Sequence, residues 1–371
     1  MRRFCGFILF LLLFSFSCSS PETPEAILNG AKEKIFSANR LSFNQLMFWE
    51  NPELDEVDTF SLEILLRKNP ETELGFDYLG KREGSGYNFI EGVLFSISHK
   101  DSIVTYYPEK NISRMNQSSM YLTNSPIRLL KNGPWNYLGD TAIDGKTYSE
   151  FLWIEMDTTI MEKKVLLKNH LFINPSNELA DFYSRRLYHD GKKNQFIDVY
   201  YSSYEFDELG EELVYEIPQG YVSKVWGQKD PEAAQVLSKG DLAHDFQLAD
   251  ENGGLVRLSD FRGKKVLLDF SMINCGWCKI ALEQFNKPDY QFAENIVPLY
   301  VNPVDSKEKM DKYRSKVAIP FPVLINAEEI GKAYGVSGYP TFFLIDENGK
   351  VEDVVVGFID EEILKWKKGV V

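Results

Sequence analysis

Residues 266–278 read Val-Leu-Leu-Asp-Phe-Ser-Met-Ile-Asn-Cys-Gly-Trp-Cys, and this stretch decides the fold of the C-terminal part of the chain. Its apolar beginning predicts a buried strand, and the spacing of Cys278, Leu282 and Phe285 predicts a helix after it. A C-x-x-C at the junction of a strand and a helix is the arrangement of a reversible disulfide. Cys275 would then cap the helix, where unpaired N–H groups and the helix dipole favour a thiolate. The sequence therefore predicts a dithiol that carries electrons.

Composition sets the broad class of the protein. The chain has 371 residues, of which 44% are hydrophobic, and this is enough for two packed cores. The aromatic fraction of 14% favours a β-rich component. A net charge of −14, without a stripe of lysine and arginine, argues against nucleic acid as a partner.

The N-terminus has the pattern of a bacterial secretory signal. Met1-Arg2-Arg3 precedes an apolar run over residues 4–16, and small residues follow it. The run is shorter than the roughly 20 residues that cross a bilayer as a helix. Cys18 directly after it resembles the lipobox of bacterial lipoproteins, although Ser15 stands where leucine is usual.

This resemblance implies a signal peptide over residues 1–17, a lipidated Cys18 and a polar tether over residues 18–25. An ordinary cleaved signal and an uncleaved anchor remain the alternatives. With Cys18 acylated, Cys275 and Cys278 are the free thiols of the mature chain. A single C-x-x-C is not the disulfide framework that holds a small exported fold together, so we interpret the pair as a reactive site and not as a structural crosslink.

Residues 26–225 are predicted to form a mainly antiparallel β domain with one leading helix over residues 26–38. Short alternating segments separated by turn signals such as Asp144-Gly145 and Asp190-Gly191 indicate a large sheet or partial barrel. The clearest segments are residues 59–64, 87–90, 93–98, 103–107 and 196–201.

The order of these pieces resembles the LolA/LolB-like lipoprotein-carrier fold. The similarity rests on the leading helix, the hairpin strands of residues 87–107, the strand of residues 195–201, and residues 212–220 as a closing strand. It implies a curved sheet, or half-barrel, around an apolar cavity that holds an acyl chain or a hydrophobic partner. The alternative is a concave face filled by the domain's own side chains.

A linker over residues 226–239 leads to an α/β domain over residues 240–371. Its predicted elements after the cysteines are a helix to about residue 287, strands at 296–301, 321–324, 341–345 and 351–357, and helices at 307–316, 328–334 and 361–368. Strand–helix–strand followed by a β-hairpin and a last helix predicts one α/β sandwich.

This second domain resembles the thioredoxin superfamily in its membrane-anchored TlpA/ResA branch. The similarity rests on Asp260-Phe261-Arg262-Gly263-Lys264, on Cys-Gly-Trp-Cys, on Phe321-Pro322-Val323-Leu324 and on residues 334–341, Tyr-Gly-Val-Ser-Gly-Tyr-Pro-Thr. It implies that Cys275 is the nucleophile and Cys278 the resolving thiol. The dithiol is itself the redox group, so we expect no organic cofactor.

Four further residues receive roles from the same resemblance. Asp269 matches a buried carboxylate that accepts the proton of Cys278; the alternative is a satisfied structural aspartate. Pro340 matches the family's cis-proline, and the backbone of Tyr339 before it would bind an extended substrate. Trp277 would contact the substrate beside the sulfurs, or only shield them.

The favoured function is reduction of disulfides in exported proteins at the periplasmic side of the cell envelope, with electrons from a membrane donor. Trp277 replaces the proline of the common reductase dipeptide, so the sequence leaves an oxidase or isomerase open. A lipid or lipoprotein carrier with a docking thioredoxin-like domain is the alternative from another class. A metal site is disfavoured because four histidines lie at no ligand spacing to the pair.

Overall fold

A computed structural model describes residues 23–160, 163–207, 213–228 and 236–369. The predicted signal peptide, Cys18 and most of the predicted tether lie outside the described residues. The chain divides into two compact units. The first comprises the described residues up to Glu50 and Val57–Trp226, and the second comprises Asn51–Glu56 and the described residues from Gly227 on.

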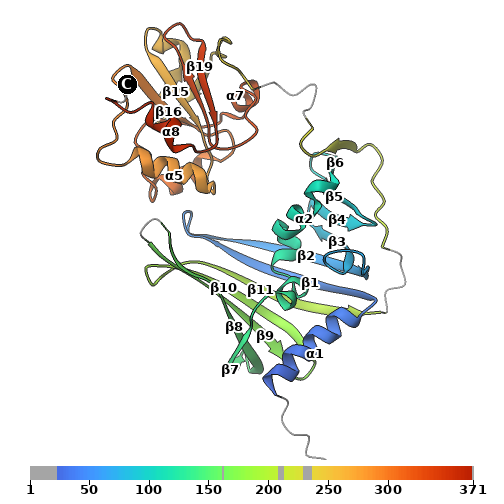
Figure 1. Ribbon diagram of the computed structural model, residues 1–371. Helices are drawn as coiled ribbons and strands as arrows, with labels where there is room; N and C mark the ends of the chain where they lie inside the picture. The colour runs from blue at the N-terminus through green and yellow to red at the C-terminus, as the bar shows by residue number, and fades with distance from the viewer. Residues whose placement is uncertain (1–22, 161–162, 208–212, 229–235, 370–371) are drawn as a thin grey trace, which may run out of the picture. The chain divides into compact units, whose positions relative to one another are not determined.

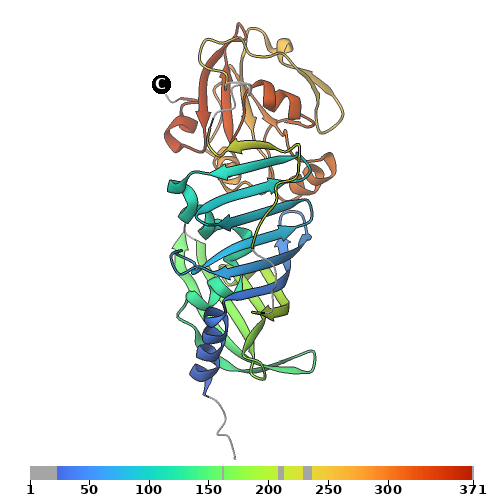
Figure 2. The same cartoon turned by 90° about the vertical axis from the view of Figure 1, so that its right-hand side faces the viewer.

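The first unit is built on one twelve-stranded sheet (Figures 1 and 2). In spatial order the strands are β12 (Val222–Val225), β6 (Ile103–Tyr107), β5 (Val93–Ser98), β4 (Ser85–Ile90), β3 (Phe76–Arg82), β2 (Glu56–Lys68), β1 (Arg40–Asn51), β11 (Lys192–Phe206), β10 (Leu179–His189), β9 (Lys163–Asn174), β8 (Lys146–Ile160) and β7 (Asn136–Ile143). The predicted segments at residues 59–64, 87–90, 93–98, 103–107 and 196–201 fall within these strands, so the strand-rich N-terminal part is confirmed.

Two of the predicted turns show why the register of this sheet is fixed. Asp144-Gly145 and Asp190-Gly191 both have positive φ at each position, which is the geometry of a two-residue type I′ turn. Ile143 consequently pairs with Lys146, and His189 with Lys192. Antiparallel ladders continue from both turns.

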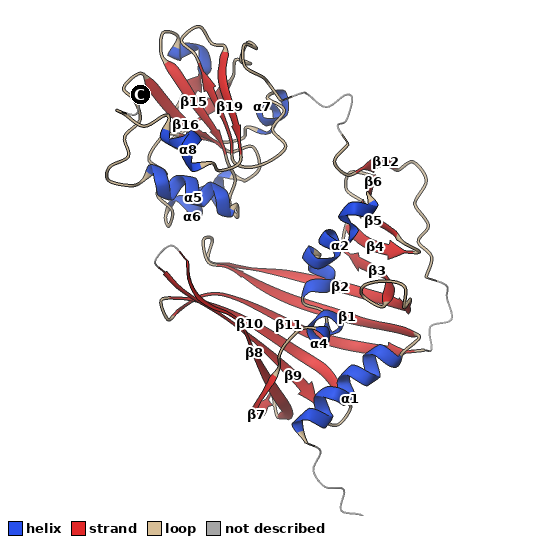
Figure 3. Ribbon diagram, viewed as in Figure 1, coloured by secondary structure: helices blue, strands red, loops and turns tan. Residues whose placement is uncertain are grey.

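Helices cover one face of the sheet. The leading helix α1 (Pro24–Ser37) buries Ile27, Ala31 and Ile35 in the main core of this unit. Three short helices that the sequence prediction missed also lie on the core side, and they are α2 (Glu109–Ser118), α3 (Met120–Thr123) and α4 (Pro126–Lys131) (Figure 3). The expectation of one helix in this domain was therefore wrong.

The closing strand expected at residues 212–220 was also wrong. Residue 212 lies outside the described residues, and residues 213–220 form no strand. Tyr215 instead packs its ring on Phe95 at a centroid distance of 5.8 Å, so this segment covers a side-chain cluster without forming a ladder. The strand begins after it, at Val222, and pairs parallel with β6.

The second unit contains a five-stranded sheet in the order β17-β16-β15-β18-β19. Its strands are β15 (Lys265–Phe270), β16 (Ile296–Val301), β17 (Val323–Leu324), β18 (Thr341–Ile345) and β19 (Val351–Val356), and its helices are α5 (Gly276–Phe285), α6 (Lys307–Arg314), α7 (Glu328–Ala333) and α8 (Asp360–Leu364). A short hairpin, β13 (Gln247–Ala249) and β14 (Leu255–Arg257), and the 3-10 helix η1 (Leu258–Phe261) precede them. β15 runs parallel to β16 and antiparallel to β18, which is the thioredoxin fold that the sequence predicts.

The two faces of this sheet bury different helices. One core cluster joins α5, α6 and α8 to the sheet, and the other joins α7 and η1 to the opposite face (Figure 3). The last helix is shorter than predicted and ends at Leu364. Beyond it the chain turns, because Trp366 is buried in the first of these clusters and its carbonyl accepts the N–H of Ala293.

Replacing Phe342 tests this core. The ring is fully buried and contacts Trp366 at a centroid distance of 5.2 Å, so Phe342→Ala should lower the free energy of unfolding of the second unit by about 3–5 kcal/mol. The free energy of unfolding is measured in urea, with hydrogen exchange of the β15 amides as the probe of the second unit. Val356→Ala, at a 59% exposed position on β19, is the control and should change the same free energy by less than about 0.5 kcal/mol. Equal losses in the two variants would contradict the core assignment.

Candidate active site

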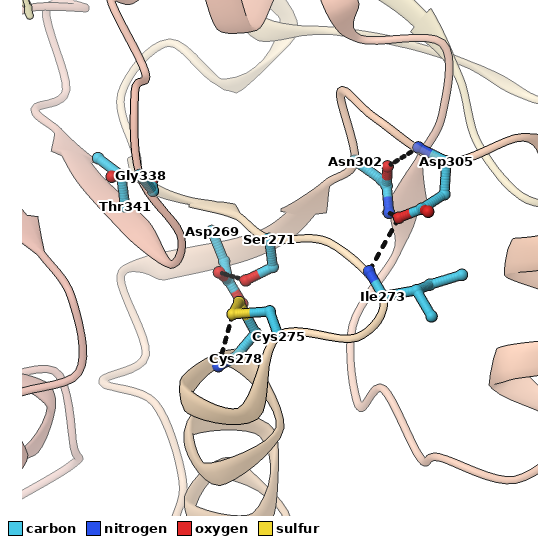
Figure 4. The surroundings of a disulfide bond; sticks show 9 residues. All are labelled: Asp269, Ser271, Ile273, Cys275, Cys278, Asn302, Asp305, Gly338 and Thr341. Carbon is cyan, nitrogen blue, oxygen red and sulfur yellow. Dashed lines mark hydrogen bonds between the residues drawn. A yellow bond between two sulfur atoms is a disulfide. The ribbon is translucent and has the colours of Figure 1, made fainter. Parts of the chain in front are cut away.

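The two cysteines lie at the beginning of α5, directly after the central strand of the second sheet. β15 ends at Phe270, a short loop follows, and Cys275 is the residue that caps the helix. A disulfide joins Cys275 to Cys278, with 5.2 Å between the Cα atoms. The backbone N–H of Cys278 also donates to Cys275 Sγ at 3.2 Å (Figure 4). The helix N-terminus therefore directs a donor and its positive dipole end at this sulfur.

The two sulfurs differ in access. Cys275 is half-buried, whereas Cys278 has 0% exposure on the face of α5 that also buries Ala281, Leu282 and Phe285. An incoming sulfur can therefore approach Cys275 but not Cys278.

Asp269 is buried on the same side of the sheet as α5. It is two residues from Leu267, which packs with Ala281 and Leu282 of the helix, and residues two apart in a strand share a face. Asp269 is 1% exposed; Ser271 Oγ donates to its Oδ1 at 2.5 Å, and its Oδ2 has no partner among the described residues. Burial raises the pKa of Asp269 to about 7, against the lowering effect of the Ser271 hydrogen bond. This carboxyl can therefore exchange a proton near neutral pH.

Tyr300 is a neighbour of Asp269 that sequence reasoning missed. It lies at the same register on β16, and the described residues offer its fully buried hydroxyl no hydrogen-bond partner. Burial raises the pKa of Tyr300 well above its usual value, and the charge of Asp269 raises it further. The signal in the sequence was a tyrosine in an otherwise aliphatic strand.

A second missed feature fixes the loop before the cysteines. Asp305 Oδ2 accepts the backbone N–H of Ile273 at 2.8 Å and the side-chain amide of Asn302 at 3.0 Å (Figure 4). Asn302 is fully buried, and its Oδ1 accepts the N–H of Asp305 at 2.7 Å. Both residues follow the carboxyl end of β16, the edge at which functional groups of parallel sheets gather. That position is the signal from which the sequence could have identified them.

The predicted cis-proline loop lies beside the end of β15. The Tyr339–Pro340 peptide bond is cis, as the resemblance implied, and a second cis bond at Gly133–Pro134 was not expected. Thr341 pairs with Phe270 and donates its hydroxyl to the carbonyl of Gly338 at 2.8 Å. The ladder thus brings Pro340 to the strand end from which the cysteine loop leaves.

Two of the predicted substrate residues differ in exposure. Trp277 is 60% exposed and stacks on Phe358, with ring centroids 6.3 Å apart and an interplanar angle of 14°. Tyr339 is half-buried, and its pKa is raised by burial first and by the charge of Asp305 second. Exposed aromatic surface therefore lies two residues from the accessible sulfur.

Two kinds of feature are missing from the described part of the chain. Within residues 23–160, 163–207, 213–228 and 236–369 there is no group of three or more His, Cys, Asp or Glu side chains that could hold a metal ion. Across the same ranges, no helix has the length and apolar character needed to span a bilayer.

Known proteins share the sequence of the second unit. The AhpC/TSA family model matches residues 239–354. Thiol-disulfide oxidoreductase ResA of Geobacillus thermodenitrificans is 36% identical over 132 residues, which are 35% of this chain and 75% of that protein. The chain belongs to the ResA-like family of thiol-disulfide oxidoreductases.

Two further relatives and one solved structure resemble the second unit in sequence. ResA of Bacillus subtilis is 32% identical, over 34% of this chain and 73% of that protein. The thioredoxin-like protein YneN of the same species is 31% identical, over 35% of this chain and 79% of that protein. A crystal structure of a putative thiol:disulfide interchange protein DsbE from Chlorobium tepidum is 34% identical, covers 34% of this chain and 91% of that one, and has a TM-score of 0.30.

The family resemblance predicted for residues 240–371 is thus confirmed, and the protein is a thiol-disulfide oxidoreductase. The family model covers no residue before 239, so the LolA-like interpretation of the first unit stays a prediction.

The raised pKa of Asp269 predicts a pH dependence of stability in the oxidised protein, in which the cysteines do not titrate. Folded Asp269 keeps its proton up to about pH 7, whereas the unfolded group loses it near its ordinary value of 3.8. The folded state therefore binds more protons between these values, and stability must fall as pH rises through that window. At about 1.4 kcal/mol per pKa unit, the loss amounts to a few kcal/mol.

Asp269→Asn removes this titration while keeping an acceptor for Ser271. Its free energy of unfolding, measured in urea at pH 5 and pH 8, should show a flatter pH dependence than the wild type, and the variant should be the more stable protein at pH 8. Asp245→Asn is the control, because Asp245 is exposed and its pKa is lowered. An unchanged slope in Asp269→Asn would show that the carboxyl does not titrate in this window.

Proposed function

We propose that this protein reduces disulfides of exported proteins through Cys275 and Cys278. One observation carries the proposal. The accessible sulfur of Cys275, which caps α5, is bonded to the fully buried sulfur of Cys278, and the buried carboxyl of Asp269 in the preceding strand has a pKa of about 7. An exchange reaction in two steps needs this asymmetry, because the first thiol must meet the substrate and the second must be withheld until the mixed disulfide exists.

The steps follow from the positions of these groups. In the reduced protein the Cys275 thiolate attacks a substrate disulfide, forms a mixed disulfide and releases one substrate thiolate. Cys278 then gives its proton to Asp269 and attacks Cys275 Sγ, which releases the second substrate sulfur as a thiolate that takes its proton from solvent. Two electrons have passed to the substrate, and the Cys275–Cys278 disulfide has formed. A membrane donor of two electrons returns the pair to the dithiol state.

Tyr339, Pro340 and Trp277 serve as the substrate-binding residues in this proposal. The pairing of Thr341 with Phe270 places the backbone of Tyr339 near the end of β15, where it can pair with an extended chain. Trp277 supplies exposed apolar surface for the same chain. The dithiol transfers the electrons itself, so the reaction calls for no organic cofactor and no metal.

We place the protein at the periplasmic face of the bacterial envelope, anchored through lipid on Cys18. The support is the sequence pattern of residues 1–18 together with a disulfide chemistry that belongs to oxidising compartments. Both the tether and the lipid would keep the dithiol near a membrane electron donor.

A carrier function of the first unit is the second candidate, and one cavity in this unit bears on it. A cavity of about 190 Å³ lies between the sheet and the short helices, with Trp49, Trp153 and Ile197 among its walls and Arg185 and Glu155 as polar groups. Ligand sites for small molecules usually have about 300–1,000 Å³. This cavity is smaller than such sites, and it would hold a short acyl segment.

Serine substitutions separate the enzyme from the carrier. Cys275→Ser should abolish reduction of a disulfide-bonded protein such as insulin, because it removes the attacking sulfur. Cys278→Ser should instead accumulate a mixed disulfide, since the resolving sulfur is missing. Mass spectrometry of non-reduced samples identifies that species. A carrier would keep its function in both variants, and full reductase activity in Cys275→Ser would contradict the proposal.

The anchor has its own test. Cys18→Ser should move the protein from the membrane fraction to the soluble periplasmic fraction and should remove the mass increment of the acyl groups from the N-terminal peptide. The reductase activity of the purified protein should be unchanged, because Cys18 is not part of the dithiol. Membrane association that survives the substitution would favour the uncleaved anchor.

A further inference from the structure

The stacked rings of Trp277 and Phe358 form an apolar surface beside the reactive sulfur, called here the Trp277–Phe358 shelf. The two residues come from distant parts of the second unit: Trp277 from the first turn of α5, and Phe358 from the segment between β19 and α8. Sequence reasoning identified Trp277 alone. Ile359, next to Phe358 in the chain, is also 47% exposed.

Phe358 is positioned by core packing and by the backbone of its neighbour Gly357. Its ring is half-buried and packs against the core cluster that contains α5 and α8. The N–H of Gly357 donates to the carbonyl of Pro340 at 2.8 Å, which ties this segment to the cis-proline loop. Gly357 has a φ of +86°, a conformation that a residue with a Cβ adopts only with strain. The glycine therefore lets the chain leave β19 and place Phe358 next to Trp277.

The stack leaves apolar surface without a cover. Trp277 is 60% exposed although it contacts Phe358, so the stack fixes the orientation of the indole and does not bury it. Exposed, rigid aromatic side chains of this kind lose little conformational entropy when a partner covers them, and tryptophan is enriched among residues that dominate binding energy.

The position of the shelf determines its occupant. Cys275 reacts only when a substrate sulfur reaches it, and Trp277 is two residues away in the chain. An extended polypeptide advances by about 3.3–3.6 Å per residue, so residues that flank the substrate cysteine lie within reach of an exposed side chain two positions from Cys275. The Trp277–Phe358 shelf is therefore placed to contact the polypeptide that brings the disulfide.

The charge next to the shelf limits the sequence of that polypeptide. Asp360 and Glu361 follow Ile359 and are both exposed. The whole chain has a net charge of −14. Acidic residues beside the substrate cysteine would meet like charge, which slows association and opposes binding.

We propose that the Trp277–Phe358 shelf determines substrate specificity, and that it selects extended polypeptide segments with an aromatic or large aliphatic residue within two positions of the disulfide cysteine and without acidic neighbours. This inference rests on the proposed function and adds the substrate class to it. It assigns Phe358 as a specificity-determining residue that takes no part in the sulfur chemistry.

The test uses the full chain and a series of short peptides, each with one cysteine disulfide-bonded to a reporter thiol. The residues flanking the cysteine are phenylalanine, leucine, serine or aspartate. The wild type should reduce the phenylalanine and leucine peptides with a kcat/KM at least about tenfold above that of the serine peptide, the range that apolar pockets achieve for a few methylene groups. The aspartate peptide should be the poorest substrate, and its deficit should shrink as salt is raised.

Phe358→Ala should lower the kcat/KM of the phenylalanine peptide toward that of the serine peptide, mainly through a higher KM. The reduction potential, which a merely shielding role of the rings would move, should stay at the wild-type value. Val356→Ala is the matched control, since it removes exposed apolar surface two residues away and should keep the full preference. If the alanine variant unfolds, Phe358→Leu replaces it, because leucine keeps the apolar packing. This variant should lose the preference for the phenylalanine peptide over the leucine peptide.

Two results would overturn the inference: a wild type without preference among the peptides, or an equal loss for all peptides in both Phe358 variants. If the wild type reduces none of the peptides and none of the protein disulfides, the proposed function itself fails. The experiment thus distinguishes the two failures.

Discussion

The capping of α5 by Cys275 is the constraint on which the rest of the active site depends. One sulfur must end the loop from β15, accept the N–H of Cys278 and face solvent, while its partner is fixed one turn further inside the helix. The direction of the helix therefore decides which thiol is accessible. The same N-terminus favours negative charge, so the geometry that positions Cys275 also stabilises its thiolate.

Everything that supports this cap lies around β15. The strand is central in the sheet, so it receives neighbours from both sides: β16 brings Tyr300 beside Asp269, and β18 brings the cis-proline loop beside its end. Asp305 then fixes the loop between strand and helix through the N–H of Ile273. A buried carboxyl that titrates near pH 7 follows from this enclosure, because the described residues give Asp269 one hydrogen bond and no opposite charge.

The sequence predicted those parts of the molecule that local pattern determines. The strands at 93–98, 103–107, 296–301 and 341–345 lie where alternation or apolar runs placed them, and the thioredoxin fold followed from motifs in a fixed order. Contacts between segments that are distant in the chain could not be predicted from local pattern. The stack of Trp277 on Phe358 joins residues 81 positions apart. The helices between residues 109 and 131 have 10, 4 and 6 residues, so they depend on tertiary packing for their stability. Residues 213–220 have a strand pattern, but the ring of Tyr215 packs on Phe95 of β5.

The reduction potential of the Cys275–Cys278 pair tests the central claim most directly. A soluble form of the protein that begins at Ser19 is equilibrated with thiol buffers of known potential, and the fraction of dithiol is measured. A reductase that is supplied with electrons should have a potential near the roughly −270 mV of thioredoxin, or lower. A value between about −180 and −120 mV, as in isomerases and oxidants of the same chemistry, would contradict reduction as the function and support disulfide formation or shuffling.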